Sequence, residues 1–487
     1  MKSYDGTPVS GIGRLTKLFS GRKRVKIISD LRTPINGISA LTKLKSISNL
    51  LKKPGYAQSC VQRLTTGCLA TACLLLVSAS PAVQAATLSG DSQTILRLKE
   101  TADGKKPYPL YEYLNLSGER MWGQGSLNLE AGGWGRLELG DKIADRRTDT
   151  ALQHGYLGYR GGKGNLFFQA GRQFIAEGVA TERLDGLYVR SDLESALTAA
   201  AFVGAPVARE TDFEGGDTIY GGRVAHSRPR YYTIGVSALR TGQDNNRIRE
   251  EEGIDLWFHP SEKLDVVGRS SYNSITSGWM EHAYSLKYAF LDTLLINASF
   301  SGINYRDYFH QVTTKVFSLT NGVLDPQEKV TSLGGSVSYM NLDDVNISAD
   351  FKTYSYDIAG SANYYGAKAA FTLPFSILTG FSVHRMDGES SRLRFNEYRI
   401  FASKKLGKAD LTVDFFDVRY DEPINDVSNT YSLAAAVGYE ISSQLRVAAD
   451  VDYGKSVDLD RQVSALLRLT YYFDKEFSRE GRSKSEK

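Results

Sequence analysis

The chain has 487 residues, of which 41% are hydrophobic and 23% charged, and its formal net charge is +4. Residues 1–85 hold 13 Lys and Arg against two Asp, a net charge of +11, so the remainder carries +4 − 11 = −7. This acidic remainder excludes a broad basic surface, and we expect no nucleic-acid partner. After residue 85, no run reaches the roughly 18 uninterrupted apolar residues of a membrane-spanning helix.

The N-terminal region has the features of an export signal. A basic flank at Arg63 precedes the apolar run 68–77, and small residues follow up to Ala85. This order predicts a signal peptide over residues 63–85 with cleavage after Ala85. Residues 1–62 form either a long basic leader or a chain start assigned too early. We expect them to be disordered and exclude them from the fold.

Residue types that carry chemistry are scarce in the rest of the chain. Cys60, Cys68 and Cys73 all precede residue 86, which leaves no cysteine for a disulfide, a zinc cluster or haem attachment. The six histidines show no ligand spacing. Ser382 and His384 are two residues apart on one strand face, roughly 7 Å, which is too far for direct proton transfer. We therefore expect no cofactor, no metal site and no enzyme activity.

Three C-terminal segments show the clearest periodicity. Over 431–440, 445–453 and 463–473, apolar residues alternate with polar or charged ones. A period of two is typical of β-strands with one apolar face. These strands reach about 10 residues, and soluble sheets commonly have strands of about 5–6. Length, terminal aromatic residues and a charged second face are typical of strands that cross a membrane around an aqueous lumen.

The same pattern runs back through the chain. The run 125–139 keeps one phase and predicts a single strand despite the Gly132-Gly133 pair. Tight connections such as 441–444 alternate with long polar ones such as 241–252, 304–330 and 421–430. We therefore predict an all-β fold, a transmembrane antiparallel up-and-down β-barrel over residues 86–474 with about 22 strands, or about 20 as the alternative. Residues 475–487 form a charged tail.

A barrel of this size is too wide for side chains to fill, so its lumen holds water, a plug or a partner. Charged residues on the polar strand faces are candidates for a pore lining, where rings of charge select ions. Both signs of charge occur among them, which favours neither cations nor anions. These candidates are Lys287, Asp350, Lys352, Lys368, His384, Arg399, Arg446, Asp450, Asp452 and Arg468.

One local motif lies in the first half of the barrel. Gly171-Arg172-Gln173 is followed by Arg183-Leu184-Asp185-Gly186. The pair resembles a motif of large outer-membrane porins, including the alginate-export type, in which glycine and arginine on adjacent strands line the pore wall. The resemblance implies that Arg172, Arg183 and Asp185 are lumen or turn residues. Alternation alone assigns Arg172 to the face of Phe168, unless a bulge intervenes.

Two functions are consistent with this sequence. The first is a pore of the Gram-negative outer membrane for diffusion of small hydrophilic solutes or ions, with outer-membrane lipid, lipopolysaccharide and the barrel-assembly machinery as partners. The second is a barrel scaffold around a periplasmic or extracellular multihaem cytochrome in electron transfer across the outer membrane, as in porin–cytochrome conduits. A large barrel allows either function.

Overall fold

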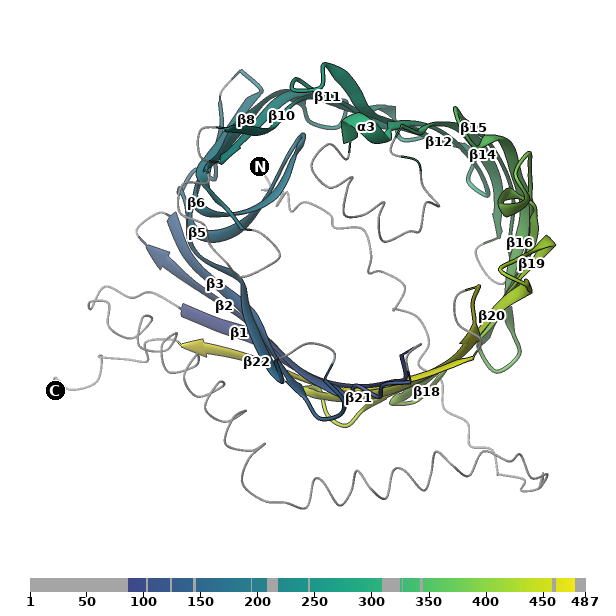
Figure 1. The fold of residues 1–487 in the computed structure, drawn as a ribbon. Helices are drawn as coiled ribbons and strands as arrows, with labels where there is room; N and C mark the ends of the chain where they lie inside the picture. The colour runs from purple at the N-terminus through teal and green to yellow at the C-terminus, as the bar shows by residue number, and fades with distance from the viewer. Residues whose placement is uncertain are drawn as a thin grey trace. The chain divides into compact units, whose positions relative to one another are not determined.

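The protein folds into one closed sheet of antiparallel strands, seen end-on as a ring in Figure 1. The computed structural model describes residues 86–477 except for 102–103, 123–124, 143–145, 194, 208–217, 244–245, 309–324, 326, 342–344 and 458–460. The predicted leader and signal peptide lie outside the described residues, as does most of the predicted tail. β1 begins at Ala86, and β22 continues to Phe477.

The strands, in chain order, are β1 (Ala86–Lys99), β2 (Pro109–Trp122), β3 (Gly125–Glu138), β4 (Thr148–Arg160), β5 (Leu166–Glu177), β6 (Ala180–Asp192), β7 (Leu197–Pro206), β8 (Thr218–Arg228), β9 (Tyr232–Gln243), β10 (Asn246–Ser261), β11 (Leu264–Asn273), β12 (Gly278–Leu291), β13 (Leu294–Asn304), β14 (Lys329–Asn341), β15 (Val345–Tyr356), β16 (Gly360–Leu373), β17 (Ile377–Gly388), β18 (Phe395–Leu406), β19 (Ala409–Ile424), β20 (Val427–Glu440), β21 (Leu445–Lys455) and β22 (Gln462–Phe477). The count confirms the predicted 22 strands, and β3 confirms that Gly132-Gly133 does not interrupt its strand.

Each strand pairs with its sequence neighbour, and the two ends of the sheet pair with each other. β1 and β22 are opposed from Ala86–Phe477 to Lys99–Ser464. This closure leaves the sheet without a free edge, so the backbone donors and acceptors of both terminal strands are paired. A barrel crossing lipid needs this arrangement, because water is not available there to satisfy a free strand edge.

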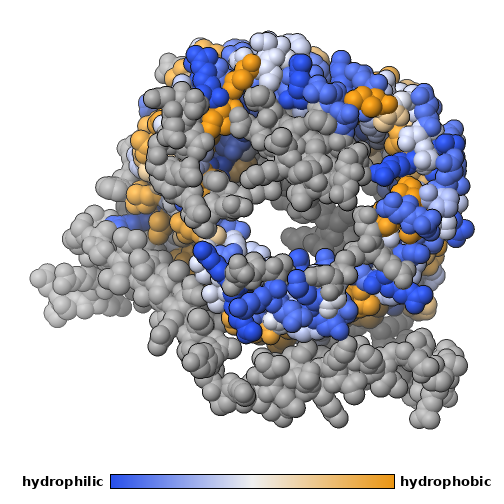
Figure 2. Space-filling view, in the orientation of Figure 1, coloured by the Kyte–Doolittle hydropathy of each residue, from blue (hydrophilic) through white to orange (hydrophobic). Residues whose placement is uncertain are grey.

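The two faces of the sheet differ in chemistry. Residues directly opposed in an antiparallel pair project to the same side, so the register can be followed from strand to strand. On β15, Ile347 and Phe351 project to the outer side and are about half exposed. Asp350 and Lys352 project to the other side, the lumenal face. In Figure 2, hydrophilic residues lie below and to the right of the visible opening of the ring.

Two connections that the sequence predicted to be long polar loops are instead largely part of β-strands. β9 and β10 extend until only residues 244–245 separate them, and β19 and β20 are separated only by Asn425-Asp426. Both Asn425 and Asp426 adopt positive φ (50° and 62°), as tight hairpin turns require. The prediction of long loops was wrong here because polar side chains do not prevent backbone pairing, which continues past the apolar part of each strand.

The longest connection, between β13 and β14, begins with a single helical turn, α3 (Tyr305–Tyr308), which packs against β11 and β12. Asp307 is buried there, and its carbonyl accepts a hydrogen bond from Asn273 Nδ2 at 2.9 Å. Burial, together with the nearby Glu328 carboxylate, raises the pKa of Tyr305 above its usual value. The remaining short element is the 3-10 turn η1 (Ser391–Leu393). Among the described residues, no helix is long and apolar enough to cross a membrane.

The difference between the faces can be tested with adjacent residues on β14. Val337 lies on the outer face and is 47% exposed, and Ser336 lies on the lumenal face opposite Asp350. Val337→Arg should destabilise the barrel by up to about 2–4 kcal/mol, the range for arginine near the bilayer midplane. Ser336→Arg, the matched control, should change stability much less. Urea unfolding in phospholipid vesicles, followed by tryptophan fluorescence, measures both, and equal losses would contradict the assignment of faces.

Candidate functional site: a hairpin on the lumenal wall

All ten charged residues predicted to line a pore lie on one continuous face of the sheet. The paired residues can be followed from strand to strand. Lys368 is opposite Ser382, which is opposite Arg399. Arg446 is likewise opposite Thr470, which is opposite Gln93 of β1. This is the face of Asp350, turned away from the exposed apolar residues. The structure thus places these residues together on the lumenal face, and their role in selecting solutes stays a prediction.

Several of these side chains are held against the wall by partners on neighbouring strands. Arg399 Nε donates to Asp414 Oδ1 at 3.0 Å, and Arg446 donates to Asp410 at 2.8 Å. His384 is buried, stacks on Tyr364 with ring centroids 5.0 Å apart, and lies 3.2 Å from Asp350. Charges paired in this way compensate one another locally, and both signs of charge occur along the described part of this face.

The hairpin of β5 and β6 departs from the regular wall. β5 pairs with β4 only as far as Arg172, opposite Gly155. At that level Gly171 is opposite Gly186, which is opposite Gly204. A Cβ on Gly186 would lie 2.1 Å from the Val203 carbonyl oxygen, and Gly171 has φ of +126°. A larger residue would not fit at these positions. The row of glycines therefore allows β5 to leave β4 here. In Figure 1 the hairpin lies inside the ring of strands.

Arg172 stabilises the point of departure. Its guanidinium forms two hydrogen bonds to Asp185, each 2.7 Å, in a forked pair. It also donates to the Leu152 carbonyl at 3.1 Å, on the part of β4 that β5 no longer pairs with. Gln173 is fully buried and donates to the Gly186 carbonyl at 3.1 Å. The motif found in the sequence therefore forms the hinge of the hairpin.

The resemblance implied that Arg172 and Asp185 are lumen or turn residues, and alternation assigned Arg172 to the face of Phe168. The pairing follows alternation, because Arg172 and Asp185 share a side with Phe168 and Leu187, and no bulge intervenes in β5–β6. Arg183 lies on the same side, opposite Phe174. This side is turned away from the surface on which the hairpin packs.

The opposite side of the hairpin packs on the lumenal face of β7 to β9. Ile175 and Leu184 join Phe202, Ile219 and Leu239 in an apolar cluster in which each side chain is at most 4% exposed. Full burial of one such side chain contributes about 1.5–3 kcal/mol. An apolar cluster of this size on a wall that otherwise meets water holds the hairpin down on that wall.

The tip of the hairpin reaches strands far from it in sequence. The Val179 amide donates to Ser237 Oγ of β9 at 3.0 Å. Gly178 has φ of +63°, and a Cβ there would lie 2.1 Å from Ser237 Oγ. A Cβ on Gly253 of β10 would lie 2.2 Å from Val179 Cγ1. Two glycines thus permit the close approach of the tip to the wall.

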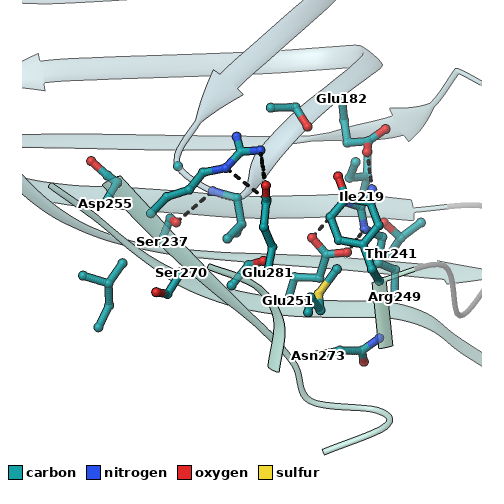
Figure 3. A pocket seen from close by; sticks show the side chains of 18 of the residues that line it. Glu182, Ile219, Ser237, Thr241, Arg249, Glu251, Asp255, Ser270, Asn273 and Glu281 are labelled. Carbon is teal, nitrogen blue, oxygen red and sulfur yellow. Dashed lines mark hydrogen bonds and ion pairs between the residues drawn. The ribbon is translucent and has the colours of Figure 1, made fainter. Parts of the chain in front are cut away.

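Ion pairs surround this contact. Glu177 accepts a hydrogen bond from Tyr188 at 2.6 Å and lies 3.7 Å from Arg223, which also forms a forked pair with Asp255. On the other side of the tip, Arg249 contacts both Glu182 of the hairpin and Glu251 of its own strand (Figure 3). Removing one side chain of such a buried ion pair leaves the other charge uncompensated, which strongly destabilises the folded protein.

Sequence reasoning did not identify this group, which consists of Glu177, Glu182, Arg223, Arg249 and Asp255. The sequence predicts strands over Asn165–Phe174 and Leu184–Arg190, whereas β5 ends at Glu177 and β6 begins at Ala180. The available signal was the run Gln173–Glu177, which contains no Gly or Pro before the turn residue Gly178. It indicated a longer hairpin, although it could not indicate the wall that the hairpin contacts.

A cavity of about 400 Å³ lies between the hairpin tip and the wall (Figure 3). Val179 and Glu182 of the hairpin line the cavity on one side, and residues of β9 to β12 line it on the other. Its volume lies within the range of about 300–1,000 Å³ that is usual for small-molecule sites. Within the described part of the chain, no group of three or more His, Cys, Asp or Glu could hold a metal ion. The fold and this site together define a large closed β-barrel of the outer-membrane type with an internal hairpin.

The chain was compared with protein families, curated proteins and solved structures. No protein-family model matches the chain, and no curated protein matches it. Among solved structures, Acinetobacter baumannii OccAB2 is 11% identical with a TM-score of 0.42, over 80% of this chain and 98% of that one. The P pilus usher (PapC) translocation pore is 9% identical with a TM-score of 0.44, over 79% and 99%. Pseudomonas aeruginosa OpdK, solved with vanillate, is 10% identical with a TM-score of 0.42, over 80% and 99%.

Docking of the hairpin can be tested with an engineered disulfide. A Cβ on residue 253 lies 3.6 Å from the Cβ of Val179, and disulfide-linked Cβ atoms lie about 3.5–4.5 Å apart. Val179→Cys with Gly253→Cys should therefore form an intramolecular disulfide, and residues 86–487 contain no native cysteine to compete. Thiol titration and non-reducing electrophoresis measure the yield. Each single variant is the control, and a pair that keeps two free thiols under oxidation would contradict the docked position.

The role of Arg172 in the hinge can be tested with the same disulfide between positions 179 and 253. Arg172→Gln removes the forked contact to Asp185 and the donor to the Leu152 carbonyl, at side chains that are 24% and 32% exposed. We expect a loss of about 1–2 kcal/mol in hairpin docking, seen as slower disulfide formation between positions 179 and 253. Arg183→Gln is the matched control, because Arg183 is exposed and forms no ion pair among the described residues. Equal rates for the two variants would show that Arg172 does not hold the hinge.

Proposed function

We propose that this protein is a pore of the bacterial outer membrane that passes small hydrophilic solutes or ions by diffusion. The observation that carries the proposal is the closed ladder with an apolar outer face and a lumenal face bearing charges from nearly every part of the ring. Such a wall is stable only with lipid outside and water inside. Lipopolysaccharide and the barrel-assembly machinery are the partners that this location would require.

The hairpin would be the part of the pore that restricts passage. It occupies lumenal space beside β7 to β10, and its contacts at Ser237, Arg223 and Arg249 join it to strands that it does not pair with. In the alternative function, a scaffold for a multihaem cytochrome, the partner would have to share the lumen with this hairpin. That requirement favours the pore. The lumenal groups are used for lining and positioning in this proposal, with no role in catalysis.

The proposal predicts conductance from the protein alone. The purified barrel should give stepwise currents in a planar lipid bilayer. A variant in which residues 173–184 are replaced by a short glycine-containing turn should give larger steps, because the lumen loses its internal hairpin. Heat-dependent migration in electrophoresis, typical of folded barrels, is the control for folding. A bilayer that stays silent while the protein co-purifies with a haem-absorbing partner would favour the scaffold instead.

A further inference from the structure

The cavity beneath the hairpin has an excess of acidic side chains. Its charged lining consists of Arg249 and Arg269 against Glu182, Glu251, Asp255 and Glu281, which is two positive minus four negative charges, or −2. Adding the neighbouring Arg223 and Glu177 leaves the difference unchanged. The excess is therefore the same with or without this neighbouring pair.

The arginines of this lining are already occupied by carboxylates. Arg249 directs its Nε and both terminal nitrogens to Glu251 and Glu182. Arg269 forms a forked contact with Glu281 at 3.1 and 3.2 Å (Figure 3). An anion entering the cavity would have to displace a carboxylate from an arginine. A cation would not, because a carboxylate accepts up to about four hydrogen bonds and keeps acceptor capacity in a forked pair.

A second observation also indicates a ligand. Ser271, on β11 opposite Gly253, lines the cavity and is only 8% exposed. No hydrogen bond joins its hydroxyl to another described residue, and the oxygen is not fully enclosed, so it is accessible from the cavity. The nearby Asn273 is engaged in the protein, since it donates to the Asp307 carbonyl and accepts from the Ile275 and Thr276 amides. Ser271 is therefore free to bind something that enters the cavity.

Part of the remaining lining is apolar. Val179 of the hairpin tip, Ile219 of β8 and Met280 of β12 border the same cavity, and Ile219 and Met280 are at most 5% exposed. A ligand suited to this surface has one charged end and a compact hydrocarbon or aromatic body. Small-molecule sites commonly combine such an apolar lining with a few polar groups that fix the orientation of the ligand.

We propose that this cavity is a binding site for a small organic cation, with a primary ammonium held by the Glu281 and Glu251 carboxylates and the Ser271 hydroxyl, and an apolar body beneath Val179. An ammonium has three donors and no acceptor, which matches a lining of carboxylates and a free hydroxyl. The inference deepens the proposed pore function by naming the solute class that the hairpin region retains. Binding itself can be measured without conductance.

The experiment is isothermal titration calorimetry of the detergent-solubilised, folded barrel with three probes of similar shape. Phenethylamine carries the ammonium, N-acetylphenethylamine is its uncharged analogue, and 3-phenylpropionate carries a carboxylate. We expect saturable binding of phenethylamine alone. Comparable binding of the uncharged or the anionic probe, or no binding of phenethylamine, would overturn the proposal.

Variants locate the binding. Glu281→Gln and Glu251→Gln should each raise the Kd for phenethylamine about tenfold, since each removes one charged acceptor of the ammonium. Asp450→Asn is the matched control, a lumenal carboxylate outside the cavity, and should leave the Kd unchanged. The disulfide between positions 179 and 253 reports whether the hairpin is still docked in each variant. An unchanged Kd in both glutamate variants, or an equal rise with Asp450→Asn, would overturn the site.

The two proposals fail separately. A barrel that binds phenethylamine and gives no current would contradict the pore and leave the site intact. A barrel that conducts and does not bind phenethylamine would contradict the site and leave the pore intact.

Discussion

The structure depends on the need to pair every backbone amide and carbonyl of a sheet that has lipid on one side. The pairing of β1 with β22 meets this need by removing both edges, and all other features of the barrel are built on that closed ladder. The requirement also explains Arg172. Where β5 leaves β4, the part of β4 before Gly155 loses its β5 partners, and the Arg172 guanidinium supplies a donor to one carbonyl there, that of Leu152, while remaining paired with Asp185.

A row of glycines allows this departure to occur without opening the barrel. Gly171, Gly186 and Gly204 lie opposite one another on three strands, and side chains at Gly186 and Gly204 would collide with neighbouring backbone atoms. Gly178 and Gly253 act in the same way at the far end of the hairpin, where backbone and wall approach closely. Both ends of the hairpin are therefore set by backbone geometry, and apolar packing between them holds it on the wall.

The hairpin changes the electrostatics of the lumen. Along β15 to β22, several lumenal charges are paired with neighbours one or two strands away and compensate one another, as Arg399 does with Asp414 and Arg446 with Asp410. Beneath the hairpin, carboxylates outnumber arginines in a space that is partly closed from above. Charges in such a space are less screened by water than those on an open wall, so an excess of the same size has a larger effect on a solute there.

Much of the fold could be predicted from the sequence, because a period of two is a local property of each strand. The alternation around Asp350 and Lys352, the final strands and the count of 22 are all determined by consecutive residues and by which face must meet lipid. The sequence also identified Gly171-Arg172-Gln173 as distinctive. It could not show that Glu182 meets Arg249, or that Val179 meets Ser237, because those contacts join residues 58–67 positions apart on strands that do not pair. Only the closed barrel brings the hairpin tip to that part of the wall, and so the cavity and its excess of carboxylates are decided by tertiary structure.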